Sequence, residues 1–351
     1  MSTRPLLLLT LLVAVLVGCA SPAEEEPTAT PEGATGAAQV VRLVTHDSFY
    51  ASEEVLAEFE ASHDARIELV PLGDAGAMVN QSILSRNNPL GDVLFGIDNT
   101  FLTRALEADL FEPYESGVLS TVPERFILDA EHRVTPIDYG DVCLNYDIGW
   151  FEEQSLDAPD ALEDLLDPAY AGLTVVMNPA SSSPGLAFLL ATVEHLGEEG
   201  WQEYWAALRE NDLLVTSGWS EAYFDHFSGG GGEGERPIVV SYASSPPFTE
   251  GATASVTADG TCFRQIEFAG VLQNAENPEL AKALIDFMLS PTFQADVPER
   301  MFVFPVVEGV PLPESFEQWA AVPANPAVID PQYIEENRSA LIEQWTEIVV
   351  R

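Results

Sequence analysis

Short apolar segments alternate with amphipathic ones along this chain of 351 residues, and that alternation restricts its fold more than any other feature. Strands are predicted at 40–44, 67–71 and 93–97, and helices at 52–63 and 77–86. In the first helix Val55, Leu56 and Phe59 share one face, and Ser52 is placed as its N-cap. The pattern is typical of an α/β fold with a largely parallel sheet.

An acidic residue follows each of the first three predicted strands: Asp47, Asp74 and Asp98. Ligands of open α/β sheets bind beyond the carboxyl ends of the strands, so these acids are predicted to share a binding site. The alternative is that each of them caps a helix. His46 lies beside Asp47, but one neighbouring His–Asp pair is weak support for acid–base catalysis.

The second half of the chain repeats the pattern with hydroxyl groups. A strand predicted at 173–177 is followed by the segment NPASSSPG at 178–185 and by a helix over 186–195. Hydroxyl and backbone N–H groups at a helix start can hold an anion or a polar ligand atom, although Ser181 and Ser183 fit helix caps equally well. A last helix is predicted at 277–289, and the glycines at 229–234 form a turn rather than a phosphate loop, because no Lys-Ser/Thr follows them.

Aromatic side chains gather between residues 213 and 248, where two apolar runs each end in rings and hydroxyl groups. Taken singly, Trp219, Tyr223 and Tyr242 are as compatible with a hydrophobic core as with a site. Together they predict a site for a small, flat cation, since an aromatic face attracts a desolvated cation by about 2 kcal/mol. A further aromatic pair lies in Met301-Phe302-Val303-Phe304-Pro305.

The N-terminus indicates export. After Arg4 an apolar run extends from 5 to 18, too short to span a bilayer, and it ends at Cys19. This arrangement resembles a bacterial lipoprotein signal, in which residues 1–18 are removed and Cys19 carries the lipid. Residues 19–40 have the composition of a flexible tether. The protein is therefore expected at the outer face of the cytoplasmic membrane.

Charge and size narrow the function further. The chain has 57 acidic and 14 basic residues, which argues against nucleic acid or anionic lipid as a partner. This charge favours a cationic partner only weakly, because a salt-adapted or very soluble surface has the same composition.

About 310 residues follow the tether, more than one hydrophobic core holds comfortably, so two lobes are expected. The chain has no Gly-x-Ser-x-Gly or His-Glu-x-x-His motif, and its five histidines are not paired at a catalytic spacing, so an enzyme is not expected.

Two cysteines remain after the predicted processing, Cys143 and Cys262. An isolated pair in an exported protein is expected to be bridged rather than free. Their spacing is not that of a zinc site.

Several segments resemble the thiamine-binding proteins, which are the substrate-binding components of bacterial ABC importers. They are spread in order over 41–310, and TSGWSEAY and SYASSPPF are the most specific. The matching segments are HDSFYAS (46–52), PLGDAG (71–76), DVLFGIDNT (92–100), PIDYGDVCLNYD (136–147), NPASSSPG (178–185), TSGWSEAY (216–223), SYASSPPF (241–248) and FMLSPTFQADVP (287–298).

The resemblance implies the type II periplasmic-binding-protein fold, in which two lobes, each a mixed sheet flanked by helices, are joined by two crossover strands. Lobe 1 would contain 41–137 and 264–308, and lobe 2 would contain 138–263 and 309–351. A monomer without cofactor or metal would hold thiamine or its phosphates in the cleft and deliver it to an ABC permease. Cys143 and Cys262 would then lie on neighbouring strands near the crossovers, within reach of a disulfide.

The resemblance also implies ligand contacts. Positions that match contacts in the family are Asp74, Ser182, Trp219 and Tyr242, and the full predicted binding set adds His46, Asp47, Ser48, Asp98, Tyr223, Phe248 and Phe302. The family usually has Tyr, Tyr and Trp where this chain has His46, Phe248 and Phe302. Stacking is kept at these three positions, but two hydroxyl groups and one indole N–H are lost. Phosphorylated thiamine is therefore expected to bind less well, and a pyrimidine precursor of thiamine is an alternative ligand.

Other functions remain as alternatives. A ferric-ion or polyamine binder of the same fold is the nearest, although the adjacent tyrosines typical of iron binders are missing, and a polyamine site has no need of the hydroxyl-rich loop at 181–183. A secreted enzyme and a cell-surface interaction module are the more distant alternatives.

Overall fold

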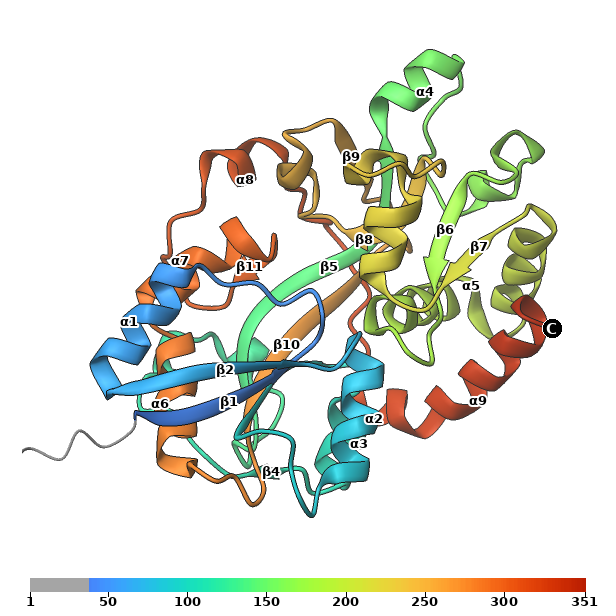
Figure 1. Ribbon diagram of the computed structural model, residues 1–351. Helices are drawn as coiled ribbons and strands as arrows, with labels where there is room; N and C mark the ends of the chain where they lie inside the picture. Colours follow the sequence, from blue (N-terminus) through green and yellow to red (C-terminus); the bar gives the residue numbers. More distant parts are fainter. Residues whose placement is uncertain (1–37) are drawn as a thin grey trace, which may run out of the picture. The chain divides into compact units, whose positions relative to one another are not determined.

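A single mixed β-sheet runs through the part of the chain that the computed structural model describes, which is residues 38–351 (Figure 1). Its strands lie in the order β2-β1-β3-β10-β5-β8-β6-β7, with β4 beside β10 and with β9 and β11 beside β5. The strands are β1 (Gln39–Thr45), β2 (Ala65–Pro71), β3 (Val93–Asp98), β4 (Phe111–Glu112), β5 (Thr135–Asp147), β6 (Thr174–Met177), β7 (Leu214–Thr216), β8 (Ile238–Tyr242), β9 (Thr253–Val256), β10 (Phe263–Leu272) and β11 (Phe304–Pro305).

The sheet is parallel at its two ends and antiparallel in its centre. β1 runs parallel to β2 and β3, and β6 runs parallel to β7 and β8. In the centre, β10 is antiparallel to β3 and β5, and β5 is antiparallel to β8. The prediction of a largely parallel sheet is therefore wrong for the centre. Parallel neighbours need a crossover connection, usually a helix, and such helices connect only the short outer strands, such as β1 to β2 and β6 to β7.

Two long strands, β5 and β10, join the two ends of the sheet and pair along most of their length (Figure 1). The register of β10 shifts against β5 between Glu267 and Phe268, and against β3 between Phe268 and Ala269. The predicted lobe boundaries, 137/138 and 263/264, fall within β5 and at the start of β10. These boundaries stay a prediction.

The helices flank this sheet. Those predicted at 52–63, 77–86 and 277–289 correspond to α1, α2 and α6, and Ser52 occupies the N-cap position of α1. The helices are α1 (Glu53–His63), α2 (Ala75–Ser85), α3 (Leu102–Glu107), α4 (Ile148–Gln154), α5 (Ser183–Glu210), α6 (Pro278–Met288), α7 (Pro291–Arg300), α8 (Glu314–Trp319) and α9 (Pro331–Val349).

Helix α5 is longer than the segment predicted at 186–195. Gly197 leaves helical geometry, with φ of 75°, a value that favours glycine. The chain then resumes the helix and continues to Glu210. The glycine therefore marks a kink rather than the end of the helix.

The C-terminal helix α9 packs against α5 and α3. Trp345 on α9 meets Trp205 on α5 edge to face, with ring centroids 5.5 Å apart, and Phe188 meets the same Trp205 at 5.8 Å. All three rings are buried, and edge-to-face pairs stabilise by about 1 kcal/mol beyond their buried area. This aromatic core holds α9 on the half of the sheet that carries α5.

Cys143 on β5 and Cys262, directly before β10, form a disulfide with their Cα atoms 4.4 Å apart. Both side chains are buried. The bridge ties together the two strands that connect the ends of the sheet.

The predicted signal peptide at 1–18, Cys19 and nearly all of the tether at 19–40 lie outside the described residues. Within residues 38–351, no helix combines the length and apolarity needed to cross a bilayer.

Candidate functional site

A cavity of about 500 Å³ opens where the two ends of the sheet face each other, a size within the range of small-molecule sites. From one end of the sheet, the lining takes the loop after β1 and the N-terminus of α2. From the other end it takes the N-terminus of α5, the short helical segment η5 (Glu221–His226) with the residues before it, and β8 with the loop after it. β10 and the end of α7, with the residues that follow α7, complete it. Segments far apart in the sequence thus meet at the carboxyl ends of β1, β2 and β6.

The structure brings most of the predicted binding residues together in this lining. They are His46, Asp47, Ser48, Asp74, Trp219, Tyr223, Tyr242, Phe248 and Phe302. Asp98 and Ser182 are not among the lining residues, and both are fully buried. Ser182 caps α5, where its Oγ accepts a hydrogen bond from the backbone N–H of Gly185 at 3.3 Å.

One wall of the cavity is aromatic. Trp219 stacks on Tyr223 with ring centroids 4.8 Å apart and planes 21° apart, and it meets Phe224 and Tyr242 edge to face. Its Nε1 donates a hydrogen bond to Ser241 Oγ at 3.0 Å, which fixes the indole. Tyr223 is 1% exposed, whereas Trp219 is half-buried. Both rings line the cavity, and Tyr223 is at the same time part of the buried core.

Phe248 and Phe302 form a second aromatic pair, with ring centroids 5.2 Å apart. Phe248 follows β8 and Phe302 follows α7, so the pair joins two segments distant in sequence. Phe302 has φ of 55°, a left-handed conformation that costs a non-glycine residue about 1 kcal/mol or more and that recurs at binding sites.

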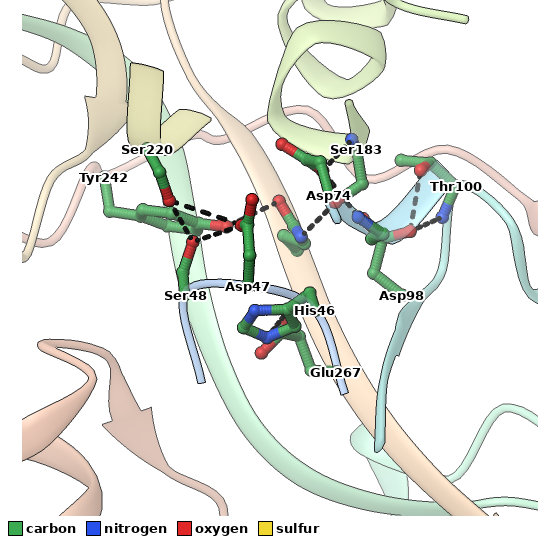
Figure 2. Close-up of polar contacts among 12 residues, drawn as sticks. His46, Asp47, Ser48, Asp74, Asp98, Thr100, Ser183, Ser220, Tyr242 and Glu267 are labelled. Carbon is green, nitrogen blue, oxygen red and sulfur yellow. Dashed lines mark hydrogen bonds and ion pairs between the residues drawn. The ribbon is translucent and has the colours of Figure 1, made fainter. Parts of the chain in front are cut away.

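Asp74 connects three backbone segments through its carboxylate (Figure 2). Oδ1 accepts from the N–H of Ala75 at 2.6 Å, as the cap of α2, and from the N–H of Ser183 at 3.2 Å. Oδ2 accepts from the N–H of Trp219 at 2.9 Å. Burial raises the pKa of Asp74, and these hydrogen bonds oppose the rise. The alternative that Asp74 caps a helix is thus correct, but the same carboxylate also ties two opposite sides of the cavity.

A second contact across the cavity is made by hydroxyl groups (Figure 2). Ser48 Oγ lies 3.0 Å from Ser220 Oγ, and Ser220 Oγ donates to Asp47 Oδ1 at 3.3 Å. Asp47 and Ser48 belong to the loop after β1, and Ser220 precedes η5. The two sides of the cavity are therefore in direct contact at more than one point.

The cavity is bounded on one side by β10, and we call this side the floor. Glu267 projects from β10 into the lining and pairs in register with Asp98 on β3 and Asp138 on β5. Glu267 Oε1 lies 3.6 Å from His46 Nε2 (Figure 2). Gly96 makes room for His46, since a Cβ at that position would clash with the imidazole.

Three titratable groups at the floor, Asp98, Asp138 and His46, have pKa values raised above their usual ones. Burial raises the pKa of Asp98 to about 7, and the nearby charge of Glu267 adds to this despite two hydrogen bonds from Thr100. Burial and then the charge of Glu267 raise the pKa of Asp138 well above its usual value. Burial lowers the pKa of His46, but Glu267, Asp74 and Asp47 outweigh it, so the net change is upward.

Sequence reasoning missed several lining residues, notably Glu267, Ser220 and Arg300, and it left Ser183 open between a ligand contact and a helix cap. For Glu267 a signal exists, because it is an acid within the otherwise apolar run IEFAGVL at 266–272. Ser220 and Arg300 carry no local signal. They face the cavity only because distant segments meet there.

Two lobes of a mixed sheet joined by two long strands, with a cavity between them, define a solute-binding protein of the type II periplasmic fold. The family model of bacterial extracellular solute-binding proteins matches residues 88–337. The thiamine-binding periplasmic protein of Salmonella typhimurium is 30% identical over 350 residues, covering 96% of this chain and 98% of the relative. The protein of the same name from Escherichia coli is 30% identical, covering 89% of this chain and 94% of the relative.

A solved structure described as a periplasmic thiamin binding protein superposes with a TM-score of 0.80 and 29% identity, covering 89% of this chain and 96% of that one. This chain belongs to the bacterial extracellular solute-binding proteins and, among them, to the family of the thiamine-binding periplasmic proteins. Members of that family are binding proteins, not enzymes.

Proposed function

We propose that this chain captures thiamine in the cavity between its lobes and delivers it to an ABC permease. The observation that carries the proposal is one cavity of about 500 Å³ in which the stacked Trp219 and Tyr223 share the lining with Asp74 and Glu267. Stacked rings suit a flat heteroaromatic ligand, and carboxylates suit its cationic ring. The names of the relatives agree with this ligand.

Thiamine offers three chemically distinct parts to such a site. The aminopyrimidine is flat and apolar on its faces, the thiazolium is permanently cationic, and the hydroxyethyl group donates and accepts hydrogen bonds. The aromatic wall supplies stacking for the first part and the carboxylates of the lining supply counter-charge for the second. The hydroxyl groups of Ser48 and Ser220 lie within the same lining for the third.

The charge of the lining favours thiamine over its phosphates. Four acids, Asp47, Asp74, Glu267 and Glu299, stand against one arginine, Arg300, in the lining. The N–H of Ser183 at the start of α5, a natural phosphate donor, is bonded to Asp74 instead. A phosphate in this cavity therefore meets like charge at close range, where repulsion is weakly screened.

The cellular setting belongs to the same proposal. Cys19 would carry a lipid, residues 19–40 would act as a tether, and a monomer would work at the outer membrane face. Detergent partitioning of the protein expressed with and without Cys19→Ala tests the anchor. Equal partitioning of the two forms into the aqueous phase would contradict it.

Calorimetric titration of the purified protein tests the ligand. We expect saturable binding of one thiamine per chain and binding of the diphosphate weaker by at least about tenfold, equivalent to about 1.4 kcal/mol. Spermidine, ferric ion and a hydroxymethylpyrimidine serve as the comparison set. Tighter binding of any of these than of thiamine would replace the proposal with that ligand.

A further inference from the structure

Three carboxyl groups lie side by side on three adjacent strands beneath the cavity. Glu267 on β10 is the central one, flanked in register by Asp98 on β3 and Asp138 on β5. Asp98 and Asp138 are 0% exposed, and Glu267, which lines the cavity, is 9% exposed. We call these three residues the carboxyl trio.

No basic partner neutralises the carboxyl trio within the described residues. No lysine or arginine of residues 38–351 lies within 4.0 Å of the three carboxylates, and the nearest ion-pair partner is His46, 3.6 Å from Glu267. Both oxygens of Asp138 and Oδ2 of Asp98 have no hydrogen-bond partner in this part of the chain. Buried acids without partners cost stability, which points to a role in function rather than in stability.

A separate observation points to a ligand at the same place. Tyr223 lines the cavity with a side chain that is 1% exposed, and its hydroxyl group has no hydrogen-bond partner among the described residues. A buried hydroxyl group left without a partner costs about 1 to 3 kcal/mol, so a polar ligand atom in the cavity would satisfy it. The cavity thus offers an unsatisfied hydroxyl group together with unneutralised acids.

We propose that the carboxyl trio recognises the positive charge of the ligand through Glu267, and that the trio loses protons when the cation binds. This inference rests on the proposed function, because it takes thiamine as the cation. Carboxyl groups held close together raise one another's pKa and stay partly protonated. A cation bound beside them lowers their pKa, so they release protons. Glu267 would face the cation, while Asp98 and Asp138 would supply charge from behind it.

The groups that face the trio determine the direction of the pH effect. They are His46 from the loop after β1, Asp74 at the start of α2 and Tyr242 at the end of β8. At low pH a protonated His46 competes with the ligand for Glu267, and the acids hold their protons. At high pH both effects disappear, so affinity for a cation rises with pH. For each proton released, affinity increases about tenfold per pH unit.

The test is calorimetric titration of the purified protein with thiamine at about pH 6 and about pH 8, in two buffers of different ionisation enthalpy, which counts the protons released. The comparison ligand is 3-deazathiamine, whose thiazolium is replaced by a neutral ring. We expect proton release and a pH-dependent affinity with thiamine, and neither with the neutral analogue. The analogue keeps the aminopyrimidine, so protons taken up or released by that ring contribute equally to both titrations and cancel in the comparison.

Variants separate recognition from structural support. Glu267→Gln should weaken thiamine binding at about pH 8 by a factor of about 30 or more and leave the neutral analogue unaffected. Asp138→Asn should reduce the number of protons released. Glu115→Gln, which removes an exposed acid outside the cavity, is the matched control and should change nothing.

Each result decides the question. Thiamine binding by the wild type without proton release and without pH dependence overturns this inference and leaves the proposed function standing. Equal loss of both ligands in Glu267→Gln assigns the residue a structural role and also overturns it. No thiamine binding at any pH overturns the proposed function together with the inference. The wild-type proton count needs no variant, so misfolding of a variant does not prevent the test.

Discussion

Trp219 combines a position in the cavity lining with two supporting contacts, the stack on Tyr223 and the hydrogen bond to Ser241. Because it is half-buried and lines the cavity, its main contribution is expected to be to binding. Trp219→Ala should cost about 2 to 4 kcal/mol of thiamine binding and less than that in the free energy of unfolding. Titration and urea unfolding of the same variant measure both.

Trp205, fully buried against Phe188 and Trp345, is the matched control for Trp219. Trp205→Phe should lower the free energy of unfolding and leave thiamine affinity nearly unchanged. If Trp219→Ala behaves like this control, with a large loss of stability at constant affinity, Trp219 is a core residue.

Asp74 has two roles that a single substitution affects differently. Asp74→Asn keeps the shape but removes the charge, so it should weaken thiamine binding by about 2 to 4 kcal/mol. One amide NH₂ must then face backbone N–H donors, which should lower the free energy of unfolding by about 1 to 3 kcal/mol. Glu115→Gln, at the surface, is the comparison. Thiamine affinity within a factor of two of the wild type would limit Asp74 to capping and bridging.

At the residue scale, the sequence indicates which side chains lie at the cavity when those side chains directly follow a strand. Asp47 and Asp74 follow β1 and β2, and both line the same cavity. Their contact with a ligand stays a prediction. Asp98 also ends a strand, but β3 is central and buried on both faces, so its carboxyl group lies under the cavity rather than in the lining. Glu267 lies in the middle of a strand, where strand-end reasoning finds nothing.

At the scale of elements, alternation of strand and helix predicted the outer parts of the sheet well. β5 and β10 pair antiparallel although α4, α5 and four further strands separate them in the sequence, so this pairing was expected only from the family resemblance. β5 carries the polar residues Asp138, Asp141 and Asn145 at buried positions, which breaks the apolar signal of a central strand. Asp138 lies in the cavity floor, and Asp141 and Asn145 make contacts between strands, so polar side chains at buried positions obscured the apolar pattern.

The disulfide between Cys143 and Cys262 belongs to this scale, because it holds β5 and β10 together across a sequence separation of 119 residues. A loop of that length corresponds to about 4 kcal/mol of stabilisation in the chain-entropy model. Unfolded, unreduced protein should therefore contain no titratable thiol after Cys19 is blocked or removed. The double variant Cys143→Ala, Cys262→Ala should unfold at lower urea, and two free thiols in the unreduced protein would refute the bridge.

At the scale of the whole molecule, stability should fall as pH rises from about 4 to about 7. Asp98 has a pKa of about 7 in the folded protein, against about 4 in an unfolded chain. Between these values the folded state binds more protons, so ionisation favours unfolding, and the stabilisation present below about pH 4 is lost by about pH 7. The net charge of −43 acts in the same direction through self-repulsion.

Asp98→Asn isolates the contribution of this one group from that of the net charge. The variant has nothing to titrate at that position, so its free energy of unfolding should change by about 2 to 4 kcal/mol less across the interval than that of the wild type. Urea unfolding at both pH values measures the difference. Parallel curves for the two proteins would show that Asp98 is ionised at neutral pH in the folded state.

The register shifts of β10 have a mechanical consequence. Both fall within two residues of Glu267, and a paired strand bends and twists most readily at such an irregularity. The Cys143–Cys262 disulfide joins β5 to the start of β10, so we expect bending to concentrate at the register shifts rather than along the whole length of these two strands. Glu267 lies beside this bending point, so we expect a ligand that contacts Glu267 to change the angle between the two ends of the sheet.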